Sequence, residues 1–235
     1  MRVYVVNSFA ELHNAICDHR IKPNENWIFR GQTGVSLLKP LLGREPYCHF
    51  EELPMFTNWY KKTRALLRQY GTLSDWDLLC FARHYGIPTR LLDWTFNPLV
   101  AAFFAVEEDS QTDSVIYCLN SSQLNEADET VSPFNQNEDV ICYDPGSLIE
   151  RNVNQCASFT VHKNSNIPLE SLPIQQTGMH KIVIKDNYRD QLMHELSFYN
   201  IHYGTLFPDL VGIEKRKKWQ FNKALAQLRL QGLIS

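Results

Sequence analysis

Several absences narrow the possibilities before any motif is considered. The six cysteines form no CxxC pair, so neither a zinc knuckle nor a thioredoxin-like motif is indicated. No apolar run reaches the length of a membrane helix, and the best of them, Leu99 to Val106, is far too short. The first residues lack the basic, apolar and small order of a signal peptide. We therefore expect reduced thiols, no metal, no membrane partner and a cytoplasmic protein.

Charge excess and the common catalytic loops are also missing. The formal net charge is -3, so no global basic field indicates a nucleic-acid partner. There is no Walker loop, GxGxxG or GxSxG, and His194-Glu195 lacks the second histidine of a zincin motif. The basic cluster Lys215 to Lys218 fits either a solvated helix face or a phosphate-contacting patch.

What is present is an ordinary globular composition with mixed periodicity. The 235 residues are 44% hydrophobic, which is enough for a substantial core and too apolar for disorder. We expect one α+β domain with a helical insertion and a C-terminal helix, divided into a strand–helix extension at 1–26 and a main domain at 27–235. The expected helices are Glu51 to Tyr70, Asp75 to Tyr85, Leu99 to Glu107 and about Val211 to Leu230; strands are expected at Arg2 to Val6, Trp27 to Arg30 and Gln155 to His162.

The stretch from Phe81 to Val106 places many polar and ionisable side chains inside an apolar, aromatic run. Burying an unpaired charge is very costly, so these groups must find partners. Two interpretations remain open at this point: a buried polar network that stabilises the fold, or the wall of a binding site. The polar members are Arg83, His84, Tyr85, Thr89, Arg90, Asp93, Trp94, Thr95 and Asn97.

Each smaller motif carries the same two alternatives. Arg30 precedes Gly31 and Gln32, and its planar fork suits a phosphate or carboxylate, but it could equally pair with Asp93. The glycine allows close approach of a ligand or of another backbone. His84 can be an acid, a base or a helix-capping residue, and Arg90 could form a buried salt bridge with Asp93.

The order of these motifs resembles the FRG domain family. Phe29-Arg30-Gly31 is followed by KPLLGRE (39–45), by the block ARHYGIPTRLLDWTFNPLVAAFFAV (82–106), by Arg151 and Gln155, and by LFPDL (206–210). The resemblance covers most of the chain from Trp27 onward. The family often has glutamine where this sequence has Arg83.

A more distant resemblance links the chain to the ADP-ribosyltransferase fold, which implies a mixed β-sheet core of that type. The arginine-type enzymes carry Arg-Gly on a first strand, matched by Arg30-Gly31. A second strand ends in a Ser/Thr cluster, matched at Thr95, and a later strand carries a Glu or Gln near a Phe-x-Val tail, matched by Gln155. By this resemblance Arg30, Thr95 and Gln155 would be catalytic; NAD, as substrate, would be bound by Arg30, Gly31, Gln32, His84, Tyr85, Thr89, Arg90, Asp93 and Trp94.

The residue at position 155 separates the functional hypotheses. The transferases use a glutamate there to stabilise an oxocarbenium-like transition state, and glutamine keeps the hydrogen bond but loses the charge. The expected function is an NAD-dependent ADP-ribosyltransferase-like protein that modifies an unknown protein or nucleic-acid acceptor, for example a toxin or anti-phage defence effector. The alternative is a non-catalytic nucleotide- or nucleic-acid-binding module. A carboxylate that reaches Gln155 would favour the enzyme, and a site without one would favour binding.

Overall fold

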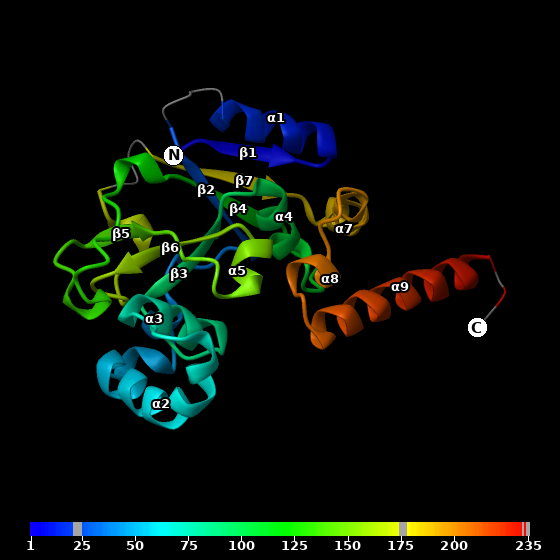
Figure 1. Ribbon diagram of the computed structural model, residues 1–235. Helices are drawn as coiled ribbons and strands as arrows, with labels where there is room; N and C mark the ends of the chain where they lie inside the picture. The colour runs from blue at the N-terminus through cyan, green and yellow to red at the C-terminus, as the bar shows by residue number, and fades with distance from the viewer. Residues whose placement is uncertain (21–24, 174–177, 232, 234–235) are drawn as a thin grey trace.

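The computed structural model describes residues 1–20, 25–173, 178–231 and 233, and it is built on one mixed β-sheet (Figure 1). Seven strands form the order β1-β7-β4-β2-β3-β6-β5. The strands are β1 (Val3–Val6), β2 (Trp27–Thr33), β3 (Leu91–Thr95), β4 (Ser114–Asn120), β5 (Val140–Tyr143), β6 (Ala157–His162) and β7 (Met179–Ile184). Adjacent strands are antiparallel except β1 and β7, which are parallel. The expected α+β class with a mixed sheet is confirmed at this level.

One face of the sheet is covered by helices α1 (Phe9–Arg20), α4 (Pro98–Val106) and α7 (Arg189–Phe198) (Figure 1). Their apolar side chains share a core cluster with β2 and β4, including Leu12, Phe103, Ile116 and Leu192. Helix α4 begins at Pro98, because Asn97 caps it by accepting from the Leu99 amide and the proline occupies its first turn. Strand β1 and helix α1 therefore belong to the same sheet and core as the rest of the chain.

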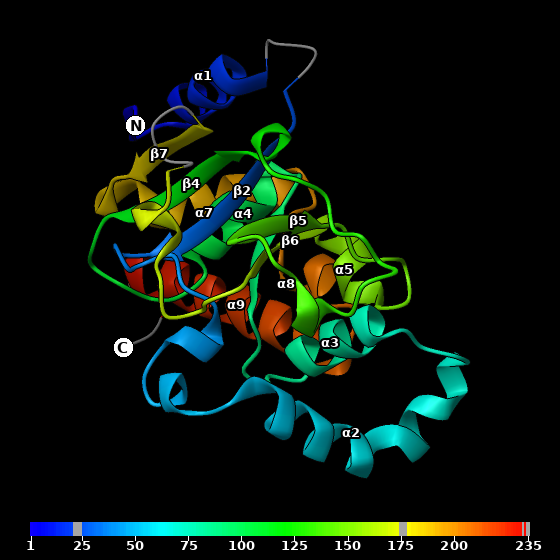
Figure 2. The same cartoon turned by 90° about the vertical axis from the view of Figure 1, so that its left-hand side faces the viewer.

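Helices α2 (Glu52–Leu67) and α3 (Asp75–His84) form the expected insertion between β2 and β3, at one end of the sheet (Figure 1, Figure 2). Ser74 caps α3 with a full capping box, since its hydroxyl accepts from the Asp77 amide and Asp77 accepts in return. Glu52 in the first turn of α2 bonds both the amide and the guanidinium of Arg90. These contacts fix the insertion against the segment that leads into β3.

Besides α7, the described part of the C-terminal half supplies three further helices. They are the short α5 (Glu150–Asn154), which directly precedes β6, α8 (Tyr203–Leu206) and the long α9 (Leu210–Leu230), which projects away from the sheet in Figure 1. The basic cluster on α9 makes contacts within the chain: Lys215 lies over the rings of Tyr203 and Phe207, and Lys218 pairs with Glu214. Among the described residues, no helix combines the length and apolar character that crossing a bilayer requires.

Gln155 is not on a strand, in contrast to the expectation. It caps the C-terminus of α5, and β6 begins at Ala157. Cys156 between them has φ +47°, a left-handed conformation that interrupts an extended chain. The alternating pattern of residues 155–162 did not reveal this turn, because alternation reports side-chain burial and not the backbone conformation of a single residue.

Candidate anion-binding pocket

A cavity of about 560 Å³ opens where β2 and β3 meet. The two strands share one antiparallel pair, Phe29 with Thr95, whereas β3 pairs with β6 along its whole length. Residues from β2, α3, β3, α4, α5 and the segment after α8 line the space. They include Arg30, Gly31, Gln32, Ser36, Arg44, Arg83, His84, Asp93, Thr95, Phe104, Glu107, Glu108, Arg151, Gln155 and Phe207. Its volume falls in the range of small-ligand sites.

The centre of the cavity is a carboxylate that faces two arginines. Arg83 donates to both oxygens of Asp93, with Nε 3.1 Å from Oδ1. Arg30 donates from Nη1 to the main-chain carbonyl of Asp93 at 2.8 Å, and the same nitrogen lies 3.5 Å from Oδ2. A guanidinium of β2 therefore bonds the β3 backbone beside the point where the two strands pair.

These contacts change the proton affinities of the groups involved. Burial lowers the pKa of Arg30 to about 10; Asp93 opposes this, and the positive charges of Arg44 and Arg83 add to the lowering. Burial alone would raise the pKa of Asp93, but Arg83 and Arg30 together hold it below its usual range. All of these groups therefore stay charged near neutral pH.

Arg44 adds a third guanidinium to the same cavity. Its Nε and Nη2 both donate to the carbonyl of Lys39, at 2.9 and 2.7 Å. Within the described part of the chain it forms no ion pair with a carboxylate. Its pKa is lowered by burial and by the nearby charge of Arg83. Three guanidiniums around the single carboxylate of Asp93 leave this part of the cavity positively charged.

The two residues expected to act on a ribose are engaged inside the protein. Thr95 donates its hydroxyl hydrogen to the Gln155 carbonyl at 2.6 Å and accepts from the Asn97 amide at 3.0 Å. The Gln155 amide nitrogen donates to the carbonyl of Leu206 at 3.0 Å. Both side chains border the cavity, but these bonds also hold together the ends of β3, α5 and α8.

Gly31 allows close approach of a helix. An added Cβ would lie 1.9 Å from the carbonyl oxygen of Ala101 in α4, so the helix backbone occupies the space that a side chain would need. The sequence left open whether Gly31 makes room for a ligand or for another backbone, and the structure shows the backbone of α4 in that place. Gln32 is buried next to it, with its amide group 3.0 Å from the Ser36 hydroxyl.

The remaining expected residues divide into two groups. His84 and Trp94 border the cavity, although the Trp94 indole N–H donates to Thr160 at 3.0 Å. Burial, together with the charge of Arg151, lowers the pKa of His84. Tyr85, Thr89 and Arg90 do not line the cavity: Tyr85 is exposed, Thr89 is fully buried, and Arg90 pairs with Glu52 instead of Asp93.

The structure also adds residues to which the sequence assigned no role. Arg44 belongs to the KPLLGRE motif, and its position beside a second arginine only becomes apparent in the fold. Glu107 and Glu108 lie at the end of α4, and burial raises the pKa of Glu107. Arg151 pairs with Asp209 at 2.9 Å and lies over the ring of Phe207, so the LFPDL segment forms part of the cavity wall.

The part of the chain that carries Arg30, Arg44 and Arg83 is similar to a known protein family. Residues 25–114 match the model of the FRG domain. This stretch is an FRG domain. The matched range holds β2, the helical insertion, β3 and α4, and so includes Arg30, Arg44, Arg83 and Asp93. No curated protein and no solved structure matches the chain.

Proposed function

We propose that the FRG domain of this chain binds a nucleotide through its phosphates, with NAD as the ligand to test first. The observation that carries the proposal is the set of Arg30, Arg44 and Arg83 around the single carboxylate of Asp93 in a cavity of about 560 Å³. Guanidiniums bind phosphate oxygens through paired N–H donors. A ligand that carries two negative charges would balance the excess.

Arg44 is the best residue for a first test. Arg30 bonds the β3 backbone and Arg83 neutralises Asp93, so their removal would disturb the fold as well as a ligand. Arg44 bonds one carbonyl and no carboxylate among the described residues. Arg64 on α2 is exposed and lies outside the cavity, which makes Arg64→Gln a matched control.

The measurement is thermal unfolding and calorimetric titration with NAD, ADP and nicotinamide mononucleotide. NAD at about a hundred times its dissociation constant should stabilise the native state by ~2.7 kcal/mol. Loss of a charge-assisted hydrogen bond in Arg44→Gln should weaken NAD and ADP binding by roughly tenfold to a hundredfold. Arg64→Gln should bind like wild type. Absence of binding by all three ligands, or equal loss in both variants, would rule the proposal out.

The second candidate function is transfer of ADP-ribose from NAD to an acceptor. It would go with a β-sheet of the ADP-ribosyltransferase type. Its support is that Arg30, Thr95 and Gln155 come from β2, β3 and the turn before β6, which are neighbours in the sheet. In this reaction the bond from the ribose C1′ to nicotinamide breaks, nicotinamide leaves with the electron pair, and an acceptor nucleophile bonds to C1′. A carboxylate must stabilise the positive charge that develops on the sugar.

Three observations rank transfer below binding. Asp93 is neutralised by arginines, Glu150 does not line the cavity, and among the described residues the Gln155 side chain hydrogen-bonds to the Leu206 carbonyl and to no carboxylate. Glu107 lines the same cavity and is the residue that could supply the charge. If transfer occurs, Glu107→Gln should keep NAD binding and reduce nicotinamide release by about a hundredfold. If the wild type binds NAD but releases no nicotinamide, transfer is excluded and only the binding function remains.

A further inference from the structure

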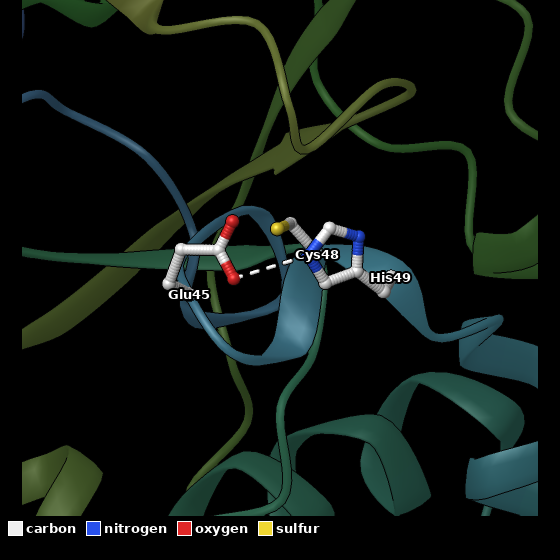
Figure 3. Close-up of side chains that lie close together, drawn as sticks. All are labelled: Glu45, Cys48 and His49. Carbon is white, nitrogen blue, oxygen red and sulfur yellow. Dashed lines mark ion pairs between the residues drawn. The ribbon is translucent and has the colours of Figure 1, made fainter.

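A surface turn next to the arginine pocket places a carboxylate, a thiol and an imidazole together (Figure 3). The ligand atoms of Glu45, Cys48 and His49 all lie within 4.8 Å of one another, and Oε2 of Glu45 is 3.1 Å from Nε2 of His49. Within residues 1–20, 25–173, 178–231 and 233, these three residues form the only group of three or more His, Cys, Asp or Glu side chains whose ligand atoms lie this close together. No common metal motif in the sequence indicates it, because Glu45, Cys48 and His49 contain neither a CxxC pair nor two histidines.

Backbone hydrogen bonds hold the three side chains on one short turn. The amides of Tyr47 and Cys48 both donate to the carbonyl of Arg44, at 2.7 and 3.0 Å, and the Phe50 amide donates to Tyr47 at 3.0 Å. The turn therefore presents its ligands from a fixed backbone. No rearrangement of distant segments is needed to bring them together, which lowers the entropic cost of forming a site.

The geometry and the ligand types fit zinc. Zinc binds thiolate, imidazole and carboxylate at about 2.0–2.3 Å in a tetrahedron, which places neighbouring ligand atoms roughly 3.3–3.8 Å apart. Separations within 4.8 Å need only side-chain rotations to reach that arrangement. We propose that Glu45, Cys48 and His49 bind one zinc ion, with the fourth position open to water or another small ligand.

Charge balance supports this site over a simple surface ion pair. A thiolate and a carboxylate side by side repel each other, and a divalent cation between them offsets both charges. Zinc binding releases the thiol proton. The two anionic ligands then cancel the ion's charge, which matters because Lys39 and Arg44 border the same space. An exposed Glu45–His49 pair would contribute little by itself and would leave the position of the thiol unexplained.

The three ligands line a second cavity of about 510 Å³, which shares Ser36 and Arg44 with the anion-binding pocket around Asp93. A zinc ion here would be a neighbour of the nucleotide site and not a part of its centre. The proposal does not depend on nucleotide binding, since its ligands are separate from Arg30, Arg83 and Asp93.

The experiment is a zinc titration of the chelator-treated, reduced full chain, in competition with a chromophoric chelator. Wild type should bind one equivalent, and Cys48→Ser and His49→Ala should each weaken zinc binding at least tenfold. Cobalt substituted for zinc should show a thiolate-to-metal charge-transfer band that is lost in Cys48→Ser. A matched control exists on α1, where Cys17 contacts His13 at 3.4 Å within a two-ligand pair. Cys17→Ser should leave the equivalent of tightly bound zinc and the cobalt band unchanged.

Protein stability can be separated from metal binding in the same experiment. Glu45 and His49 are exposed, so Glu45→Gln and His49→Ala should melt like wild type in the presence of chelator. Zinc should raise the melting temperature of wild type and not of these variants. Absence of zinc binding, or binding that Cys48→Ser does not change, would overturn the proposal.

Discussion

At the level of single residues, Asp93 contributes both to the stability of the fold and to the wall of the cavity. Its carboxylate neutralises Arg83, and its main-chain carbonyl holds Arg30. The sequence left two interpretations open for this stretch, a buried network or a site wall. The structure contains both features, since the same paired groups border a cavity and leave Arg44 without a carboxylate among the described residues.

The contact between Gly31 and α4 leads to a sharp prediction at this scale. Gly31→Ala should destabilise the protein by about 3 kcal/mol or more, because the added Cβ would lie 1.9 Å from the Ala101 carbonyl oxygen. Chemical denaturation measures the effect. Gly146 has open space around it, so Gly146→Ala should change the stability by less than about 1 kcal/mol. Equal stability of the two variants would mean that α4 does not pack on β2 as described.

His162 predicts a pH dependence of stability. Burial lowers its pKa from 6.5 to about 4 in the folded protein, so the unfolded chain binds the proton more tightly. Stability should therefore be present in full above pH 6.5 and fall as the pH drops from 6.5 to about 4, by ~3 kcal/mol. Below pH 4 this contribution no longer changes.

The measurement is urea denaturation at several pH values for wild type and for His162→Gln, which keeps a group able to bond Thr160. The slope between pH 4 and 6.5 should become flatter in His162→Gln. His13 is exposed on α1, and His13→Gln should keep the wild-type slope. An unchanged slope in His162→Gln would assign the pH dependence to other groups.

At the level of elements, the helical insertion depends on one buried ion pair. Glu52 and Arg90 are nearly inaccessible, with side-chain exposures of 4% and 14%, and they join α2 to the segment before β3. Removing one partner of a buried pair leaves an uncompensated charge, which costs about 3–5 kcal/mol. Because α3 follows α2 and carries Arg83 and His84, this pair also positions one wall of the cavity.

Glu52→Gln should accordingly destabilise the chain by about 3 kcal/mol, as measured by chemical denaturation. Glu51 is its exposed neighbour, and Glu51→Gln should have an effect below about 0.5 kcal/mol. If the two variants are equally stable, Arg90 has an alternative partner and α2 is not fixed through Glu52. Weakened ligand binding in a folded Glu52→Gln would link the insertion to the pocket.

At the level of the whole molecule, β1 and α1, which lie in the first 20 residues, take part in the sheet and in its core. Strand β1 pairs with β7 over four residues, and Leu12 and Ile16 of α1 are buried with side chains of α4 and α7. The sequence suggested an extension beside the main domain, and the FRG match begins at residue 25. In the structure the extension covers one edge of the sheet that carries the pocket.

A fragment of residues 27–235 should therefore lose the single cooperative unfolding transition of the full chain and associate, because β7 becomes an exposed edge strand. Thermal unfolding and size-exclusion chromatography test this. Leu12→Ala in the full chain should destabilise by about 2–5 kcal/mol, whereas Val5→Ala at an exposed position should have little effect. A fragment that melts as a monomer at the wild-type temperature would show that the extension is separable.

The sequence alone was sufficient for the elements and for the family of residues 25–114. The helical insertion and α4 agree with the prediction from sequence, because apolar periodicity and capping preferences are local properties of the chain. The Gln155 segment was the exception, since one left-handed residue, Cys156, turns the chain before β6. Local patterns do not report such a single backbone choice.

Only the tertiary structure decided which charged groups meet. Arg90 pairs with Glu52, which is 38 residues earlier, while Arg83 takes Asp93, and Arg44 joins them from the loop after β2. The physical reason is that long side chains choose partners by distance in space, and several carboxylates are compatible with each arginine in sequence. The sequence by itself therefore determined the elements and the kinds of chemistry present. The fold determined that three guanidiniums surround one carboxylate.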